Sequence, residues 1–344
     1  MRSKRLVSLT CAGLFAGCVF GLSTAVASAT TLTGAGSTLV APIEAEWAAA
    51  WGTATGNTVT YAPVGSGSGY KDIAQGQVDF GGSDAPLAVY STPPCANCVQ
   101  IPWALTATGV SYHINGLRLP RRTNLHLTGP VLAKIYLGQI KNWDSPQIKA
   151  LNKGAHIPST PITVFWRSDA SGDTYAFTRF LSDVSSPFLH QVGSSTQVSF
   201  PVGVGAKGNG GMSTALAGTN GGIAYIAVSY LIANRQPAIG IKNASGHYVV
   251  PNLGAIEAAA AVVHHVPAGN QVTIVNPPRS AKSAYPISTF TYAIVPTTAP
   301  QGGLLQSFFN YAIGPGQRFG PSLDFAPLPK NVLAADRATI RRIG

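Results

Sequence analysis

Residues 167–174 have the composition of an anion-binding site. Ser171, Asp173 and Thr174 are residue types that cap helices, and a run with the apolar spacing of a helix follows them directly. A helix start presents unpaired backbone N–H groups and a partial positive charge, so a small oxyanion can bind there. Arg167 ends a strand-like run and can supply a bidentate guanidinium. The alternative is an ordinary capped helix beside a surface arginine.

Three further loops share this character, at 32–39, 65–70 and 78–86. The first two are rich in glycine, which lets a ligand approach backbone N–H groups closely. The third follows a strand-like run, and its pattern predicts Asp84 exposed at a turn. Each loop alone is more often a plain turn, but four in one chain favour a shared oxyanion site.

Strand-like and helix-like runs alternate along the chain, which predicts an α/β fold. The expected strands are 58–61, 108–112, 162–166 and 290–295, and the expected helices are 43–51, 131–137, 256–263 and 304–311. The chain of 344 residues exceeds a typical single core, so two domains are expected.

Residues 1–29 have the pattern of a signal peptide, with early cations, an apolar stretch and small residues at Ala27 and Ala29. Cleavage after Ala29 is predicted, which would place the mature protein in the periplasm or outside the cell. The alternative is a membrane anchor through lipidation of Cys18, since the residues before it resemble a lipobox.

Cys95 and Cys98 are the only cysteines after this leader. A C-x-x-C pair can be a redox motif or half of a zinc site, but zinc needs two more ligands and none lies near in sequence. Since an exported chain meets an oxidising environment, a disulfide that closes this loop is predicted and no metal site is expected.

The formal net charge of +11 comes from scarce acids, with 12 Asp and Glu against 23 Lys and Arg. Because the cations are scattered, nucleic-acid binding is not expected. The sequence also argues against an enzyme. Residues 203–208 fit the G-x-G-x-x-G dinucleotide-binding motif, but such a site needs an acid about twenty residues further on and the next acid is Glu257. Neither a Walker motif nor a nucleophile elbow occurs.

The four loops and two further motifs together resemble the PstS family, the phosphate-binding components of bacterial ABC phosphate importers. The matching motifs are TGAGST at 33–38, GSGSG at 65–69, VDFGGSDAPL at 78–87, IYLGQIKNW at 135–143, RSDASGDT at 167–174 and GGIAY at 221–225. Their order and spacing agree with the family over nearly the whole mature chain.

The resemblance implies a two-domain fold of the periplasmic-binding-protein type II, with two hinge crossovers and a ligand cleft between the domains. Domain I would comprise 30–106 and 285–344, and domain II 107–284. It also implies capture of inorganic phosphate, delivery to a membrane ABC permease with its ATPase subunits, and no cofactor. The alternatives are a secreted phosphatase-like enzyme or a binder of another tetrahedral oxyanion.

The resemblance further implies which residues contact phosphate: Thr38, Leu39, Ser66, Asp84, Arg167, Ser171, Gly172 and Asp173. Asp84 would accept a proton from the ligand and Arg167 would be the cation. Asp173 departs from the pattern, because it stands where some family members have a threonine donor. Asp173 either turns away to cap the helix or pair with Arg167, or it is a second acceptor that faces another phosphate hydroxyl; we expect the second.

Overall fold

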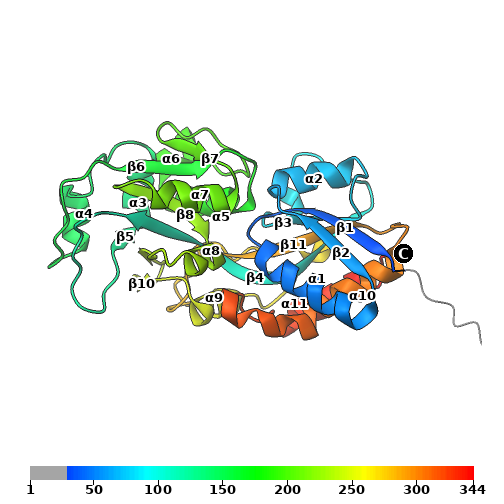
Figure 1. Ribbon diagram of the computed structural model, residues 1–344. Helices are drawn as coiled ribbons and strands as arrows, with labels where there is room; N and C mark the ends of the chain where they lie inside the picture. Colours follow the sequence, from blue (N-terminus) through cyan, green and yellow to red (C-terminus); the bar gives the residue numbers. More distant parts are fainter. Residues whose placement is uncertain (1–28) are drawn as a thin grey trace, which may run out of the picture.

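The computed structural model describes residues 29–344, and it has two lobes that lie side by side (Figure 1). We call the lobe with β1, β2, β3, α1, α2, α10 and α11 the first lobe, and the lobe with β6, β7, β8, α3, α5, α6 and α7 the second lobe. The expected leader lies outside the described residues, except for Ala29.

The elements alternate between strand and helix, as expected for an α/β chain. In chain order they are β1 (Thr31–Gly36), α1 (Ala41–Thr55), β2 (Thr58–Ala62), α2 (Ser66–Ala74), β3 (Phe80–Ser83), η1 (Leu87–Val89), β4 (Cys98–His113), β5 (His126–Thr128), α3 (Gly129–Tyr136), α4 (Pro146–Leu151), β6 (Thr163–Arg167), α5 (Gly172–Val184), α6 (Ser186–Gln191), β7 (Val204–Ala206), α7 (Gly208–Ala217), β8 (Gly222–Ala227), α8 (Val228–Ala233), β9 (Gly240–Lys242), β10 (Tyr248–Val249), α9 (Leu253–Ala260), η2 (Ala268–Asn270), β11 (Ser288–Pro296), α10 (Gly302–Ile313), η3 (Pro315–Phe319), η4 (Pro321–Leu323) and α11 (Lys330–Ile340).

One eight-stranded sheet runs through both lobes in the order β2-β1-β3-β11-β4-β8-β6-β7. The outer pairs are parallel, whereas β11 and β4 pair antiparallel with each other and with their other neighbours. The loops that follow β1, β3 and β6 therefore leave the sheet at carboxyl ends of parallel strands, where α/β proteins build their ligand sites.

Strand β4 passes from one lobe to the other. Its residues 98–107 pair with β11 and its residues 108–113 pair with β8. Thr108 lies at this change of partner, where its N–H donates to Ile287 O at 3.0 Å and its carbonyl accepts from the Tyr285 hydroxyl at 3.2 Å. The two expected crossover segments thus lie against each other. Asn270, which the expected boundaries place in domain II, nevertheless donates to Gln100 and Thr339, which they place in domain I.

Aromatic side chains fill the interior of each lobe. In the first lobe, Trp47 packs on Trp103 with ring centroids 5.3 Å apart. In the second lobe, Phe177 of α5 packs on Tyr136 and on Tyr225, with ring centroids 4.6 and 4.5 Å away. Such pairs add to the stability that burial provides. The packing of Phe177 fixes α5, the helix that begins in segment 167–174.

Most expected elements occur with shifted ends. Helix α5 begins at Gly172, with Ser171 as its N-cap, and α9 covers Leu253–Ala260 rather than 256–263. Cys95 and Cys98 form the predicted disulfide, with Cα atoms 5.1 Å apart. Within residues 29–344, every helix is too short or too polar to span a bilayer.

Candidate functional site

Asp84 lies directly after β3 and is only 1% exposed. The expectation that this side chain is exposed at a turn is wrong, because Ser37, Ser66 and the start of α5 cover it. Ser37 Oγ lies 2.6 and 2.7 Å from the two carboxylate oxygens, and Ser66 Oγ donates at 3.3 Å. The loops after β1, β2 and β3 therefore meet at one buried carboxylate.

Gly172 brings the second lobe onto this carboxylate. Its backbone N–H donates to Ser66 Oγ at 3.1 Å, and Gly67 N–H donates to Ala170 O at 3.0 Å. A Cβ at position 172 would lie 2.6 Å from Asp84 Cα, so a larger residue would push the lobes apart. These contacts join the start of α2 to the start of α5 in a closed arrangement.

Arg167 ends β6 and is 4% exposed, so it is not the surface arginine of the alternative interpretation. Its Nε donates to Asp169 Oδ1 at 2.8 Å, its Nη2 also pairs with Asp169, and its Nη1 lies 3.1 Å from Asp173 Oδ2. The Tyr225 hydroxyl accepts from the Arg167 backbone N–H at 2.9 Å. The guanidinium is thus held in place by two carboxylates.

Asp173 is completely buried and has three partners. Thr108 Oγ1 donates to Oδ1 at 2.6 Å, while Asn209 Nδ2 donates to Oδ2 at 2.8 Å beside Arg167. The pairing with Arg167 that was one of the two alternatives therefore exists. This pairing does not exclude the alternative that Asp173 faces a second ligand hydroxyl, because a carboxylate has about four acceptor positions and these bonds use three.

The remaining expected residues lie in the same network. Ser171 Oγ caps α5 by accepting from Asp173 N–H at 3.1 Å. Leu39 N–H donates to Ser37 Oγ at 3.0 Å. Thr38 Oγ1 accepts from the Asn209 amide at 2.9 Å. All eight residues expected at the site are consequently joined, directly or through Ser37 and Asn209.

Burial controls the ionisation of the two central carboxylates. Loss of hydration and repulsion from Asp173 raise the pKa of Asp84 from 3.8 to about 7, against hydrogen bonds from Ser37 and Ser66 and the charge of Arg167. Burial also raises the pKa of Asp173, although Arg167, Thr108 and Asn209 act to lower it. The two carboxylates titrate as a pair that resists full ionisation.

Sequence reasoning assigned no role to four residues of this network: Ser37, Thr108, Asp169 and Asn209. Ser37 and Asp169 stand inside the quoted motifs, so their positions were visible. Thr108 is the first residue of an expected strand, and only the crossing of β4 between the lobes brings it to Asp173. Asn209 follows the glycine-rich stretch 203–208, which offered a weak signal for a loop near a ligand.

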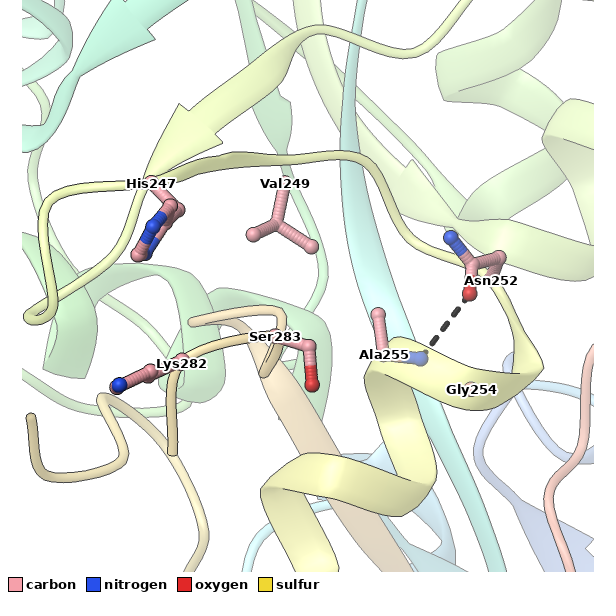
Figure 2. Close-up of a pocket in the computed structure, with 7 residues that line it drawn as sticks. All are labelled: His247, Val249, Asn252, Gly254, Ala255, Lys282 and Ser283. Carbon is pink, nitrogen blue, oxygen red and sulfur yellow. Dashed lines mark hydrogen bonds between the residues drawn. The ribbon is translucent and has the colours of Figure 1, made fainter. Parts of the chain in front are cut away.

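A cavity with a volume of about 640 Å³ lies elsewhere. Figure 2 shows His247, Val249 and Lys282 along it, together with the first turn of α9. There the Asn252 side chain accepts from Ala255 N–H at 3.0 Å, so the cap of this helix is satisfied within the chain. None of the residues expected at the anion site lines this cavity. A smaller cavity of about 300 Å³ adjoins Thr38, Asp169 and Lys207.

Comparisons with known proteins agree with this geometry. Residues 23–315 match the PBP superfamily domain. The phosphate-binding protein PstS of Xylella fastidiosa (strain Temecula1) is 33% identical over 306 residues, covering 88% of this chain and 82% of that protein. The phosphate-binding protein PstS of Pasteurella multocida is 33% identical over 320 residues, covering 91% and 90%.

Solved structures show the same architecture. A high affinity periplasmic phosphate-binding protein, PfluDING, bound with phosphate at pH 8.5, is similar with a TM-score of 0.69 and 25% identity, covering 90% of this chain and 93% of that one. A phosphate-binding protein from Stenotrophomonas maltophilia has a TM-score of 0.66 at 20% identity, covering 90% and 94%, and supports the fold alone. By its sequence and by its fold, this chain belongs to the PstS family within the PBP superfamily.

Proposed function

We propose that this protein is an exported binding protein that captures inorganic phosphate and delivers it to an ABC permease with its ATPase subunits. The observation that carries the proposal is the buried carboxylate of Asp84, which lies where the hydroxyl-rich and N–H-rich loops of both lobes meet. Membership of the PstS family supports the same ligand, since the relatives are named for phosphate binding.

The donors and acceptors are divided as a partly protonated anion requires. The proposed donors are the hydroxyls of Thr38 and Ser171, the backbone N–H groups of Leu39 and Gly172, and the guanidinium of Arg167. The Ser66 hydroxyl joins them when its hydrogen, which Asp84 accepts in this structure, turns to the ligand. The proposed acceptors are Asp84 and Asp173. Donors at a helix start and a guanidinium suit phosphate oxygens, whereas carboxylates suit phosphate hydroxyl groups.

Selectivity against sulfate follows from Asp84. A buried acceptor that finds no hydrogen costs about 1–3 kcal/mol, and more when it is charged. Hydrogen phosphate and dihydrogen phosphate bring a hydrogen to the Asp84 carboxylate. Sulfate brings none, and above about pH 7 the Asp84 carboxyl has lost its own proton. The site would therefore reject sulfate because a sulfate oxygen would face the Asp84 carboxylate with no hydrogen between them, and not because of size.

The charges around the site favour a ligand with more than one proton. Among the described residues of this network, one cation, Arg167, is surrounded by Asp84, Asp169 and Asp173. Two of these carboxylates already pair with the guanidinium. We propose that Asp173 uses its remaining acceptor position for a second phosphate hydroxyl, so that dihydrogen phosphate is the matched species.

Opening and closing of two domains would admit and release the ligand. We propose a domain I of 30–106 and 285–344, a domain II of 107–284, and a hinge where β4 and the segment before β11 cross between them. The hydrogen bonds between Thr108 and the segment 285–287 support a common hinge point.

We propose a binding role and not a catalytic one. The hydroxyls nearest the carboxylates serve as donors: Ser37 and Ser66 to Asp84, and Thr108 to Asp173. Such bonds hold the hydroxyls in place and do not pair them with a histidine base, as nucleophilic catalysis by serine commonly does.

Cleavage after Ala29 would release the mature protein into the periplasm or the medium.

Calorimetric titration of the mature protein with phosphate and with sulfate tests the proposal. Binding of phosphate together with weak or no binding of sulfate is expected, and comparable affinity for both anions would contradict it. Asp84→Asn should relax the discrimination, because the amide supplies a donor. Asp79→Asn is the matched control, since Asp79 lies in the same motif but accepts from Thr33 N–H at 2.7 Å instead.

A further inference from the structure

Asn209 connects the two lobes at the centre of the anion network. It lies in the first turn of α7 and is completely buried. Its Nδ2 donates to Thr38 Oγ1 at 2.9 Å and to Asp173 Oδ2 at 2.8 Å, and its backbone N–H reaches Thr38 Oγ1 at 3.3 Å. Thr38 belongs to the first lobe and Asp173 to the second, so one amide group spans both.

The orientation of this amide is determined by a backbone group. Asn209 Oδ1 accepts from Ala227 N–H at 2.8 Å. A backbone N–H can only donate, so the oxygen of the amide must face Ala227 and the NH₂ group must face Thr38 and Asp173. Asp173 in turn accepts from Thr108 at the point where β4 crosses between the lobes. Donor and acceptor roles are therefore set along the whole series from Thr108 to Thr38.

The Thr38 hydroxyl, at the end of this series, is left with one possible role towards a ligand. A hydroxyl has one hydrogen and two lone pairs. Both bonds that the described residues make at Thr38 Oγ1 are accepted ones, from the side chain and the backbone of Asn209. The lone pairs are thus engaged and the hydrogen is left to donate. An anion needs donors, so this is the polarity that phosphate requires of Thr38.

We propose that Asn209 is a positioning residue that couples closure of the lobes to phosphate recognition, by turning the Thr38 hydroxyl into an obligate donor when the lobes meet. The inference rests on the proposed function and adds a residue that is not itself a ligand contact. In an open arrangement Thr38 would lose Asn209 and its hydroxyl could turn freely. Closure would then create one of the donors that hold the anion.

The kinetic consequence follows from the position of Asn209. First encounter of phosphate with an open protein does not need the contact between Asn209 and Thr38, but escape from the closed protein must break it. Loss of Asn209 should therefore raise the dissociation rate much more than it lowers the association rate. We expect about tenfold or greater loss of affinity, the order for one hydrogen bond to a charged group.

A double-mutant cycle tests this coupling. Phosphate affinity and dissociation rate are measured for Asn209→Ala, Thr38→Val and the double variant, with compaction on ligand binding followed by small-angle X-ray scattering. Ser213→Ala is the matched control, because Ser213 is a buried residue of the same helix whose Oγ donates to Gln236 at 2.8 Å. The control should lose stability but keep wild-type affinity.

The inference predicts that the double variant binds within about threefold of the weaker single variant, since Asn209 acts on phosphate affinity through the Thr38 hydroxyl. Multiplied losses would overturn it, and so would wild-type affinity in Asn209→Ala. If Asn209→Ala does not fold, Asn209→Asp replaces it, because that variant keeps the size of the side chain and the acceptor for Ala227. In that variant a carboxylate oxygen replaces the donor at Thr38, so the Thr38 hydrogen turns to it and is lost to phosphate. Adding Thr38→Val should then cost little further affinity. Failure of the wild-type protein to bind phosphate would instead refute the proposed function itself.

Discussion

The pH dependence of phosphate affinity tests the proposed role of Asp173 most directly. If Asp84 and Asp173 both face the ligand, the complex holds two protons between the carboxylates and the phosphate. Below the second ionisation of phosphate the free ligand already carries both, and the free protein also holds a proton on Asp84, whose pKa burial raises to about 7. Binding there releases a proton, so affinity should rise toward neutral pH. Above the second ionisation the free ligand carries one, so binding must take up a proton and affinity should fall as pH rises.

The structure indicates the size of this effect. Hydrogen phosphate would leave one buried carboxylate against a bare oxygen, at a cost of about 1–3 kcal/mol or roughly five- to 150-fold in affinity. At the limit the fall is about tenfold per pH unit, since one proton is taken up per ligand bound. The pKa of Asp84, raised by burial to about 7, means that the proton can reside on Asp84 or on the ligand. The position of that proton within the complex does not alter the slope, because linkage counts protons. Above about pH 7 free Asp84 is ionised, and the uptake of one proton per ligand is then complete.

The assay is calorimetric titration with phosphate at several pH values between about 5 and 8, with a buffer series to count proton uptake. Asp173→Thr should flatten the fall at high pH, because a donor then replaces the second acceptor and hydrogen phosphate fits. A wild-type affinity that stays flat or rises above the second ionisation of phosphate would show that Asp173 only holds Arg167 in place. Asp79→Asn is again the control for loss of a carboxylate outside the site.

Four further outcomes are expected. Asp84→Asn should bind sulfate measurably in the calorimeter, and retained selectivity would show that Asp84 is not the acceptor. Arg167→Ala should weaken phosphate binding by more than about 1 kcal/mol, because it removes the one cation of the network, and an unchanged dissociation constant would place the site elsewhere. Replacing Cys95 and Cys98 by alanine should lower the melting temperature and leave affinity near wild type, so loss of binding in a folded variant would argue against a purely structural disulfide. Burial raises the pKa of Glu44 from 4.5 to about 8. The native state therefore holds an extra proton between these values and the free energy of unfolding falls as pH rises through them. Glu44→Gln should remove this fall in denaturation experiments at about pH 5 and pH 8, and an unchanged pH dependence would mean that Glu44 is hydrated.

Local sequence patterns were sufficient to predict the loops of the site. Glycine and hydroxyl residues after apolar runs marked the ends of β1, β2 and β3, and the Ser171 cap marked the start of α5. These signals are short in range, because capping and tight turns depend on a few neighbouring residues. The resemblance to a family then supplied their assembly into one site, which no spacing along the chain could show.

Burial and partners could not be predicted in the same way. Asp84 was expected at an exposed turn because aspartate usually is exposed, yet Gly172 of the other lobe packs directly over it. Thr108 and Asn209 reach Asp173 from β4 and α7, which are distant in sequence. Their roles depend on the strand order of the sheet and on the closed arrangement of the lobes, which are both non-local properties.

The arrangement of charges suggests how this site can be selective without a strong positive field. Arg167 is already paired with Asp169 and Asp173, so its attraction for a further anion is largely offset. An ion that relied on charge alone would gain little by leaving water for such an interior. Phosphate differs because its own hydrogens turn the carboxylates from repelling groups into acceptors. On our proposal discrimination rests on the match of donors and acceptors, and Asn209, Ser37 and Thr108 maintain that match by fixing which of their partners donate and which accept.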